Sequence, residues 1–173
     1  MRLSLNCPLN SVSFGQVSTA LLREAYKKEM DVLVALLGDR PDLSSQGQDP
    51  EFFRWVEGAI RDFNLKHSRN RPTFKLWHLN GAMSFVSDNQ ACMTFHELDD
   101  LTKTEVNIAK NLDKLIVSSK YTQEVLLSKD IKSHYIPLGF DYSNFSRKEK
   151  KYYEDGRIVF NLSGKFEFRK RHA

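Results

Sequence analysis

The sequence predicts an α/β protein, a Rossmann-like open parallel sheet with helices on both faces. Short apolar or β-branched runs alternate with amphipathic stretches along most of the chain, which is typical of parallel strands joined by helices. The length of 173 residues indicates one domain, with at most a fragment of a second. Hydrophobic residues make up 40% of the chain and charged residues 28%, which excludes a disordered chain because enough apolar surface is present to offset the ordering entropy.

The first half of the chain is expected to form strand, helix, strand and helix in turn. The first strand, Leu3–Cys7, leads into a polar loop, and a helix is expected from Gln16 because apolar residues then recur every four positions. A second strand, Val32–Leu37, follows. The second helix is expected to begin at Asp49 and Pro50, since Asp caps the first free amides and Pro suits the first turn.

The second half repeats the alternation with shorter elements. Thr102 and Glu105 have the spacing of a capping box, and Ser119 is suited to cap a further helix. The connection between the third and fourth strands is short for a crossover helix. The expected elements are the strand Thr73–His78, the loop Leu79–Asn89, the strand Gln90–Phe95, a helix from Lys103 to about Asn111, the strand Leu115–Val117, the helix Lys120–Ser128 and the strand His134–Pro137.

Charge is unevenly placed along the chain. Residues 146–173 contain nine Lys or Arg and four Asp or Glu, whereas the rest of the chain is close to neutral. A near-neutral body argues against a surface that coats nucleic acid, so no nucleic-acid partner is expected. The basic end suits a phosphate-bearing partner, and a solvated run of charge explains it as well.

The last part of the chain differs in composition from the rest. Residues 145–156 have the composition of a linker, and a strand is expected at Ile158–Leu162. A single strand cannot form its own core. Either this strand docks on another surface, or it is the first strand of a second domain that continues beyond Ala173. An unsheltered strand at 158–162 also favours self-association with another chain.

Nothing in the sequence indicates secretion, a membrane span or a metal site. No apolar run approaches the roughly 18 residues that span a bilayer, and Met1–Asn6 leads into a polar loop instead of a signal sequence. The sequence therefore predicts an uncleaved, cytoplasmic protein without a transmembrane segment, with a peripheral position at a membrane surface left open. Cys7 and Cys92 lie in apolar stretches, and neither they nor the His residues have metal-ligand spacing, so reduced core cysteines and no metal or cofactor are expected.

Four segments of the chain carry further information through their order and spacing. They are LNSVSFGQVS (residues 9–18), TFHELD (94–99), KLIVSS (114–119) with YIPLGFD (135–141), and IVF (158–160) ahead of Gly164–Lys165 and Arg169–Lys170. Together they cover nearly all of the chain. In this order the chain resembles the amino-terminal half of group 1 glycosyltransferases, which have the GT-B fold.

The resemblance implies a two-domain enzyme that transfers a sugar from a nucleotide-sugar to a carbohydrate, lipid or protein acceptor between two Rossmann-like domains. Residues 1–144 then form the acceptor-side domain, residues 145–156 the linker, and residues 157–173 the first strand and phosphate loop of a second domain. The family's carboxylate pair lies beyond Ala173. The resemblance thus implies a truncated chain that alone lacks most of the donor site.

The resemblance also assigns phosphate-binding roles. A departing nucleoside diphosphate gains negative charge, which cations and backbone amides stabilise. Gly164, Lys165, Arg169 and Lys170 match the family's glycine and basic residues, and a frayed, charged chain end is the alternative. Gly15 opens the first helix, where the missing Cβ would let the backbone approach a donor phosphate; an ordinary strand-to-helix turn explains this glycine as well.

Two pairs of polar residues stand at or just past the carboxyl ends of expected strands, where open parallel sheets bind ligands. His96 and Glu97 are the candidate catalytic residues, because an imidazole can bind a sugar and a carboxylate can orient or deprotonate an acceptor hydroxyl. His78 and Asn80 are candidate acceptor-binding residues. Capping or bracing of loops is the alternative for both pairs. Asp141 is expected to brace its loop through bonds to the backbone.

Two other functions compete with sugar transfer. A non-catalytic Rossmann-like binding module would use the basic end to hold an acidic partner or a membrane surface. A free-standing Rossmann-like enzyme for a small phosphorylated ligand has less support, because no glycine-rich phosphate loop follows the first strand.

Overall fold

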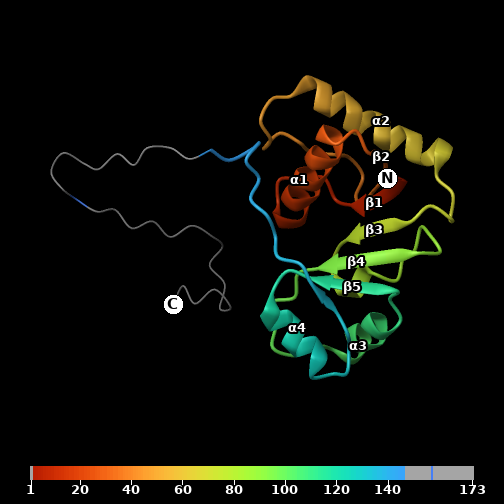
Figure 1. Ribbon diagram of the computed structural model, residues 1–173, viewed down its shortest axis with the longest axis vertical. Helices are drawn as coiled ribbons and strands as arrows, with labels where there is room; N and C mark the ends of the chain where they lie inside the picture. The colour runs from red at the N-terminus through yellow and green to blue at the C-terminus, as the bar shows by residue number, and fades with distance from the viewer. Residues whose placement is uncertain (1, 147–156, 158–173) are drawn as a thin grey trace.

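The computed structural model describes residues 2–146 and residue 157 (Figure 1). The expected strands and helices between residues 3 and 137 are present, with small differences at their ends. In chain order they are β1 (Arg2–Cys7), α1 (Ser13–Lys27), β2 (Asp31–Leu36), α2 (Pro50–Lys66), β3 (Thr73–Leu76), the 3-10 helix η1 (Leu79–Gly81), β4 (Gln90–Thr94), α3 (Lys103–Lys110), β5 (Lys114–Val117), α4 (Lys120–Leu127) and β6 (His134–Tyr135).

The strands form one six-stranded sheet in the order β2-β1-β3-β4-β5-β6. Every neighbouring pair is parallel, which confirms the expected α/β fold with a Rossmann-like open sheet. The chain steps outward from β1 to β2, returns past β1 to β3, and then continues outward in the other direction to β6. The strand order therefore reverses between β1 and β3, and such a reversal is where open α/β sheets bind ligands.

Helices cover both faces of the sheet, as expected, but unevenly. Leu5 pairs in register with Val34 and with Phe74, so these side chains share one face, and Leu5 and Val34 pack there with residues of α1. The opposite face carries Leu115 and Val117, which pack with α3 and α4. Right-handed connections explain the difference, because the step from β1 to β2 runs in the opposite direction to the steps from β3 to β6.

Most helix starts follow their local sequence signals. Asp49, Thr102 and Ser119 each accept a hydrogen bond from a backbone amide in the first turn of α2, α3 and α4, and this confirms the expected caps. The first helix is different. It begins at Ser13, earlier than the expected Gln16, and no side chain caps it.

The connection from β3 to β4 contains only a short 3-10 helix and is held to the sheet by polar side chains. Lys75 on β3 is wholly buried, and its Nζ donates to the carbonyl oxygen (2.7 Å) and to Oγ (2.6 Å) of Ser84. Burial lowers the pKa of this amine. The hydroxyls of Thr73 and Ser87 share a further hydrogen bond. Hydrogen bonds from strand side chains thus replace the packing of a crossover helix here.

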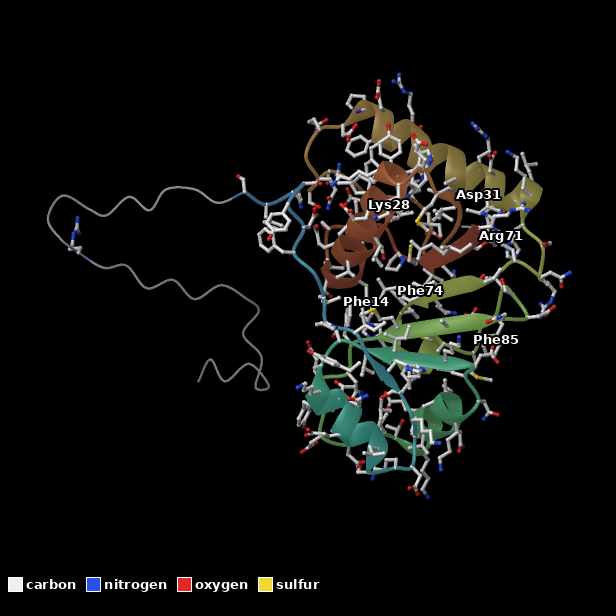
Figure 2. All side chains as sticks on the ribbon, in the orientation of Figure 1. Phe14, Lys28, Asp31, Arg71, Phe74 and Phe85 are labelled. Atoms are coloured by element: carbon white, nitrogen blue, oxygen red, sulfur yellow. The ribbon has the colours of Figure 1, made fainter. Side chains whose placement is uncertain are left out.

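A buried arginine joins the starts of β2 and β3 at the amino edge of the sheet. Arg71 Nη2 donates to the carbonyl oxygen (2.5 Å) and to Oδ1 (2.8 Å) of Asp31. The hydrogen bond from this guanidinium holds the pKa of the Asp31 carboxyl below its usual range. Figure 2 shows the pair on the opposite side of the molecule from Phe14.

After β6 the chain passes along the carboxyl edge of the sheet. Residues 136–146, named here the crossing segment, run from β6 at one end of the sheet towards α1 (Figure 1). Lys27 Nζ donates to Ser143 Oγ (2.8 Å), and the amide of Gly47 donates to Asn144 Oδ1 (3.2 Å). The crossing segment is therefore attached to α1 and to the loop ahead of α2.

The crossing segment presents aromatic side chains to solvent. The Phe140 ring contacts those of Tyr142 and Phe145, with centroids 4.8 and 6.1 Å apart, and all three side chains are exposed. Asp141 Oδ1 accepts hydrogen bonds from two backbone amides further along the segment, at 3.1 and 3.2 Å. This confirms the expected bracing by Asp141. The strand expected at Ile158–Leu162 and most of the expected linker lie outside the described residues.

Candidate functional site

The candidate site lies at the carboxyl edge of the sheet, where the strand order reverses. Loops that follow β1, β3 and β4 meet there, and one side chain joins them. Phe14, on the first turn of α1, stacks on the ring of Phe95 after β4 with centroids 4.6 Å apart. Its ring also meets the ring of His78 after β3, again with centroids 4.6 Å apart. Phe14 thus fixes the ends of β3 and β4 against the start of α1.

His78 lies on the exposed side of this aromatic cluster. Its ring packs edge-on against Trp77, with centroids 5.2 Å apart, in addition to Phe14. The Trp77 ring lies against Gly81, where a Cβ would come within 2.7 Å of the indole nitrogen, so this close packing requires glycine. His78 and Asn80 are both exposed. The aromatic contacts orient the imidazole of His78 and leave it open to solvent.

His96 is held more firmly than His78. Its Nε2 lies 3.1 Å from the carbonyl oxygen of Asp100. A carbonyl oxygen can only accept, so Nε2 carries the proton and Nδ1 has the free lone pair when the ring is neutral. The carbonyl oxygen of His96 accepts from Thr122 Oγ1 at 2.8 Å, which ties the loop to α4. His96 is half-buried, and Glu97 beside it is exposed.

Asp100 anchors the far end of this loop. Its Oδ1 lies 2.8 Å from Lys129 Nζ. The hydrogen bond from this ammonium group holds the pKa of the Asp100 carboxyl below its usual range. The loop after β4 is thus attached at Thr122 and at Lys129, which gives the His96 ring a defined place at the carboxyl edge.

Gly15 is buried, and its own loop fills the space beside it. A Cβ on Gly15 would meet the backbone oxygen and the side-chain Oδ1 of Asn10 and would lie 2.5 Å from the Asn10 amide nitrogen. The packing of the loop after β1 on α1 therefore requires glycine here. A role of Gly15 towards a donor phosphate stays a prediction.

Three of the hollows on the described residues lie away from these side chains. One of about 590 Å³ lies at the amino edge beside α1, one of about 510 Å³ between α1 and the start of α2, and one of about 500 Å³ between β2, α2 and the loop before β4. None of the three is lined by His78, His96 or Glu97. Gly15 is also absent from the lining of all three, so none of these hollows joins the candidate residues.

The expected phosphate-binding residues Gly164, Lys165, Arg169 and Lys170 lie outside the described residues. Within residues 2–146 and 157, no three His, Cys, Asp or Glu side chains come together in a group that could hold a metal ion. Over the same part of the chain, every helix is too short or too polar to cross a membrane.

Sequence reasoning missed the residues that organise the site. Phe14, Phe95 and Thr122 position the loops that carry His78 and His96. In the sequence Phe14 belongs to the expected polar loop, Phe95 ends an expected strand and Thr122 lies in an expected helix, so none of them stands out. The only available signal was the aromatic residue directly before each histidine, Trp77 before His78 and Phe95 before His96.

No family model, curated protein or solved structure matches the chain. The resemblance to group 1 glycosyltransferases therefore stays a prediction from the sequence motifs.

Proposed function

We propose that the chain is the acceptor-side domain of a glycosyltransferase that uses a nucleotide-sugar donor. One observation carries the proposal. The centroid of the Phe14 ring lies 4.6 Å from that of His78 and 4.6 Å from that of Phe95. Phe14 therefore holds two histidine-bearing loops together at the reversal of the strand order. This is the position at which open α/β sheets bind ligands.

His96 is the proposed general base. Sugar transfer forms a bond between an acceptor oxygen and the anomeric carbon and breaks the bond from that carbon to the donor phosphate, while the hydroxyl proton must leave. His96 Nδ1 has the lone pair to accept this proton, because Nε2 donates to the Asp100 carbonyl. Glu97 would orient the acceptor hydroxyl, and His78 and Asn80 would bind the acceptor at the neighbouring loop.

The donor phosphates would be met by basic residues outside the described part of the chain. Lys165, Arg169 and Lys170, with the backbone at Gly164, are the proposed partners of the departing diphosphate. In this proposal the open carboxyl edge is one side of a cleft, and a second body supplies the other side.

Nuclear magnetic resonance titration of the chain tests where sugars bind. With UDP-glucose, GDP-mannose, glucose and mannose as probes, we expect saturable shifts of the backbone amides of Phe14, His78 and His96 with at least one probe. Shifts confined to one of the hollows elsewhere, or no shifts with all four probes, would contradict the proposal.

A kinetic test uses matched histidine variants and measures the release of nucleoside diphosphate by the intact two-domain enzyme of this proposal. We expect His96→Ala to lower kcat/KM tenfold or more, which corresponds to about 1.4 kcal/mol of transition-state stabilisation. His134→Ala is the control, because His134 is exposed on β6. A kcat/KM of His96→Ala equal to that of the His134→Ala control would remove His96 from the mechanism.

A non-catalytic binding module is the second candidate function. The exposed aromatic side chains Phe140, Tyr142 and Phe145 on the crossing segment favour it, because exposed aromatic groups are enriched in protein interfaces. Such a module would bind its partner regardless of nucleotide-sugar. In the titration, this function would leave the amides near His96 unshifted.

A further inference from the structure

An apolar groove of about 590 Å³ lies at the amino edge of the sheet, on the face that α1 covers in part. We name it the amino-edge groove. Its floor consists of side chains from the starts of four strands, among them Leu3, Val32, Phe74 and Ala91, and the last turns of α1 form one wall. The groove lies at the opposite edge of the sheet from His96.

The direction of the connections explains why this face is open. Parallel strands are normally covered on both faces. Here η1, α3 and α4 lie on the opposite face, and α1 covers only the region near β1 and β2. Phe74 and Ala91 are consequently half-buried, although they are neighbours in register in the middle of the sheet. Apolar surface on β3 and β4 thus has no helix over it among the described elements.

The shape of the groove suits an extended chain better than a helix. It runs across the strand starts from β2 to β5, four strand spacings or about 19 Å at about 4.8 Å per spacing. Along the strands it is short, because buried side chains such as Leu76 and Met93 occupy the carboxyl half of the same face. A helix packed along the strands would find only a short contact there, whereas an alkyl chain laid across them would use the full length.

The charged side chains along the groove favour an anion. Lys28 at the end of α1 and Lys114 at the start of β5 both line it, and both are exposed. Figure 2 shows Lys28 at the end of α1 and Phe74 on β3. Neither lysine forms an ion pair with another described residue. Glu24, the acidic side chain in the lining, is already paired with Lys27 at 2.8 Å.

We propose that the amino-edge groove binds a single-chain amphiphile with an anionic head group, of the fatty-acid class. The alkyl chain lies over Phe74 and Ala91, and the head group lies at Lys28 or Lys114. The carboxyl-terminal residues 146–173 are less suited to the groove, because their excess of Lys and Arg has the same sign as its lysines.

Fluorescence titration with 11-(dansylamino)undecanoic acid tests the proposal on the full chain. We expect saturable binding of one probe per chain, with displacement by dodecanoate at least tenfold more effective than by dodecyltrimethylammonium, both below their micelle concentrations. The double variant Lys28→Gln/Lys114→Gln should weaken probe binding at least tenfold. Lys110→Gln, at an exposed position on α3, is the matched control and should leave probe binding unchanged.

A second variant tests the floor of the groove. Ala91→Phe should fill the groove and abolish probe binding, and the thermal midpoint shows whether the variant remains folded. The lysine variants change exposed side chains, so they keep the proposal testable if Ala91→Phe does not fold. Four results would each overturn the proposal. They are no saturable binding, equal displacement by both surfactants, unchanged affinity in the lysine double variant, and binding to phosphatidylserine vesicles without binding of dodecanoate.

Discussion

Substitution of Gly15 tests the packing at the start of α1. In the interior of an exposed helix, Gly→Ala stabilises a protein by about 0.5–1 kcal/mol. At Gly15 the added Cβ would overlap the backbone and side-chain oxygens of Asn10 and would lie 2.5 Å from its amide nitrogen. Backbone atoms of the loop would have to move, and overpacking of this kind costs about 1–3 kcal/mol. We therefore expect Gly15→Ala to lower the free energy of unfolding.

Gly58 provides the matched control. It also lies in a helix, α2, but the nearest atom to a Cβ there is Arg61 Nη2 at 3.8 Å, an ordinary contact. Gly58→Ala should therefore stabilise the protein by about 0.5–1 kcal/mol, so the two substitutions have opposite signs. For a chain of this length a loss of 1–3 kcal/mol corresponds to a fall in Tm of about 3–10 °C.

Urea denaturation followed by circular dichroism, together with calorimetric Tm values, measures both variants. A Gly15→Ala variant as stable as the wild type would refute the close contact with Asn10. Gly15 would then have no packing role, and this would favour the prediction that its missing Cβ lets the backbone approach a donor phosphate.

Three other substitutions or treatments test separate parts of the structure. Hydrogen bonding from Arg71 lowers the pKa of Asp31 in the folded state, so the ionised Asp31 stabilises the fold above its unfolded pKa of about 4, and this stabilisation is lost as pH falls through the folded pKa. The stability difference between wild type and Asp31→Asn should therefore shrink in acid. Urea midpoints of the two proteins that stay equally separated from pH 7 to pH 2 would contradict this. Burial raises the pKa of the Cys7 thiol to about 12 and that of the Cys92 thiol to about 11. Ellman's reagent at pH 8 should therefore label neither thiol in the native protein and both in urea. Rapid labelling of the native protein would show that the two thiols are not buried. Thr102→Ala should cost about 1 kcal/mol through loss of the α3 capping box, and an unchanged urea midpoint would count against that cap.

The fold was predictable where its signals are local. The caps at Asp49 and Thr102 depend on hydrogen bonds within one helical turn, so residue type and spacing were sufficient. The start of α1 was predicted too late because no side chain caps it and the packing of Gly15 on Asn10 allows the helix to begin at Ser13. Alternating apolar runs indicated the strands, since each is buried on at least one face.

The site was less predictable because its contacts are distant in sequence. The spacing of His78 and His96 after strands was visible, but Phe14 joins them only once β1, β3 and β4 lie side by side. The amino-edge groove has the same origin. Phe74 and Ala91 have the composition of buried strand residues, and only the direction of the connections leaves one of their faces open.

The attachment of the crossing segment bears on the order of events during folding. The bond between Lys27 and Ser143 joins residues 116 apart in the chain, and that between Gly47 and Asn144 joins residues 97 apart. Contacts that close such long loops stabilise the protein only after the intervening chain has been ordered. We therefore expect this segment to dock on α1 last during folding and to detach first in native-state hydrogen exchange, so that its contacts with α1 and with the loop ahead of α2 are both the latest to form and the earliest to open.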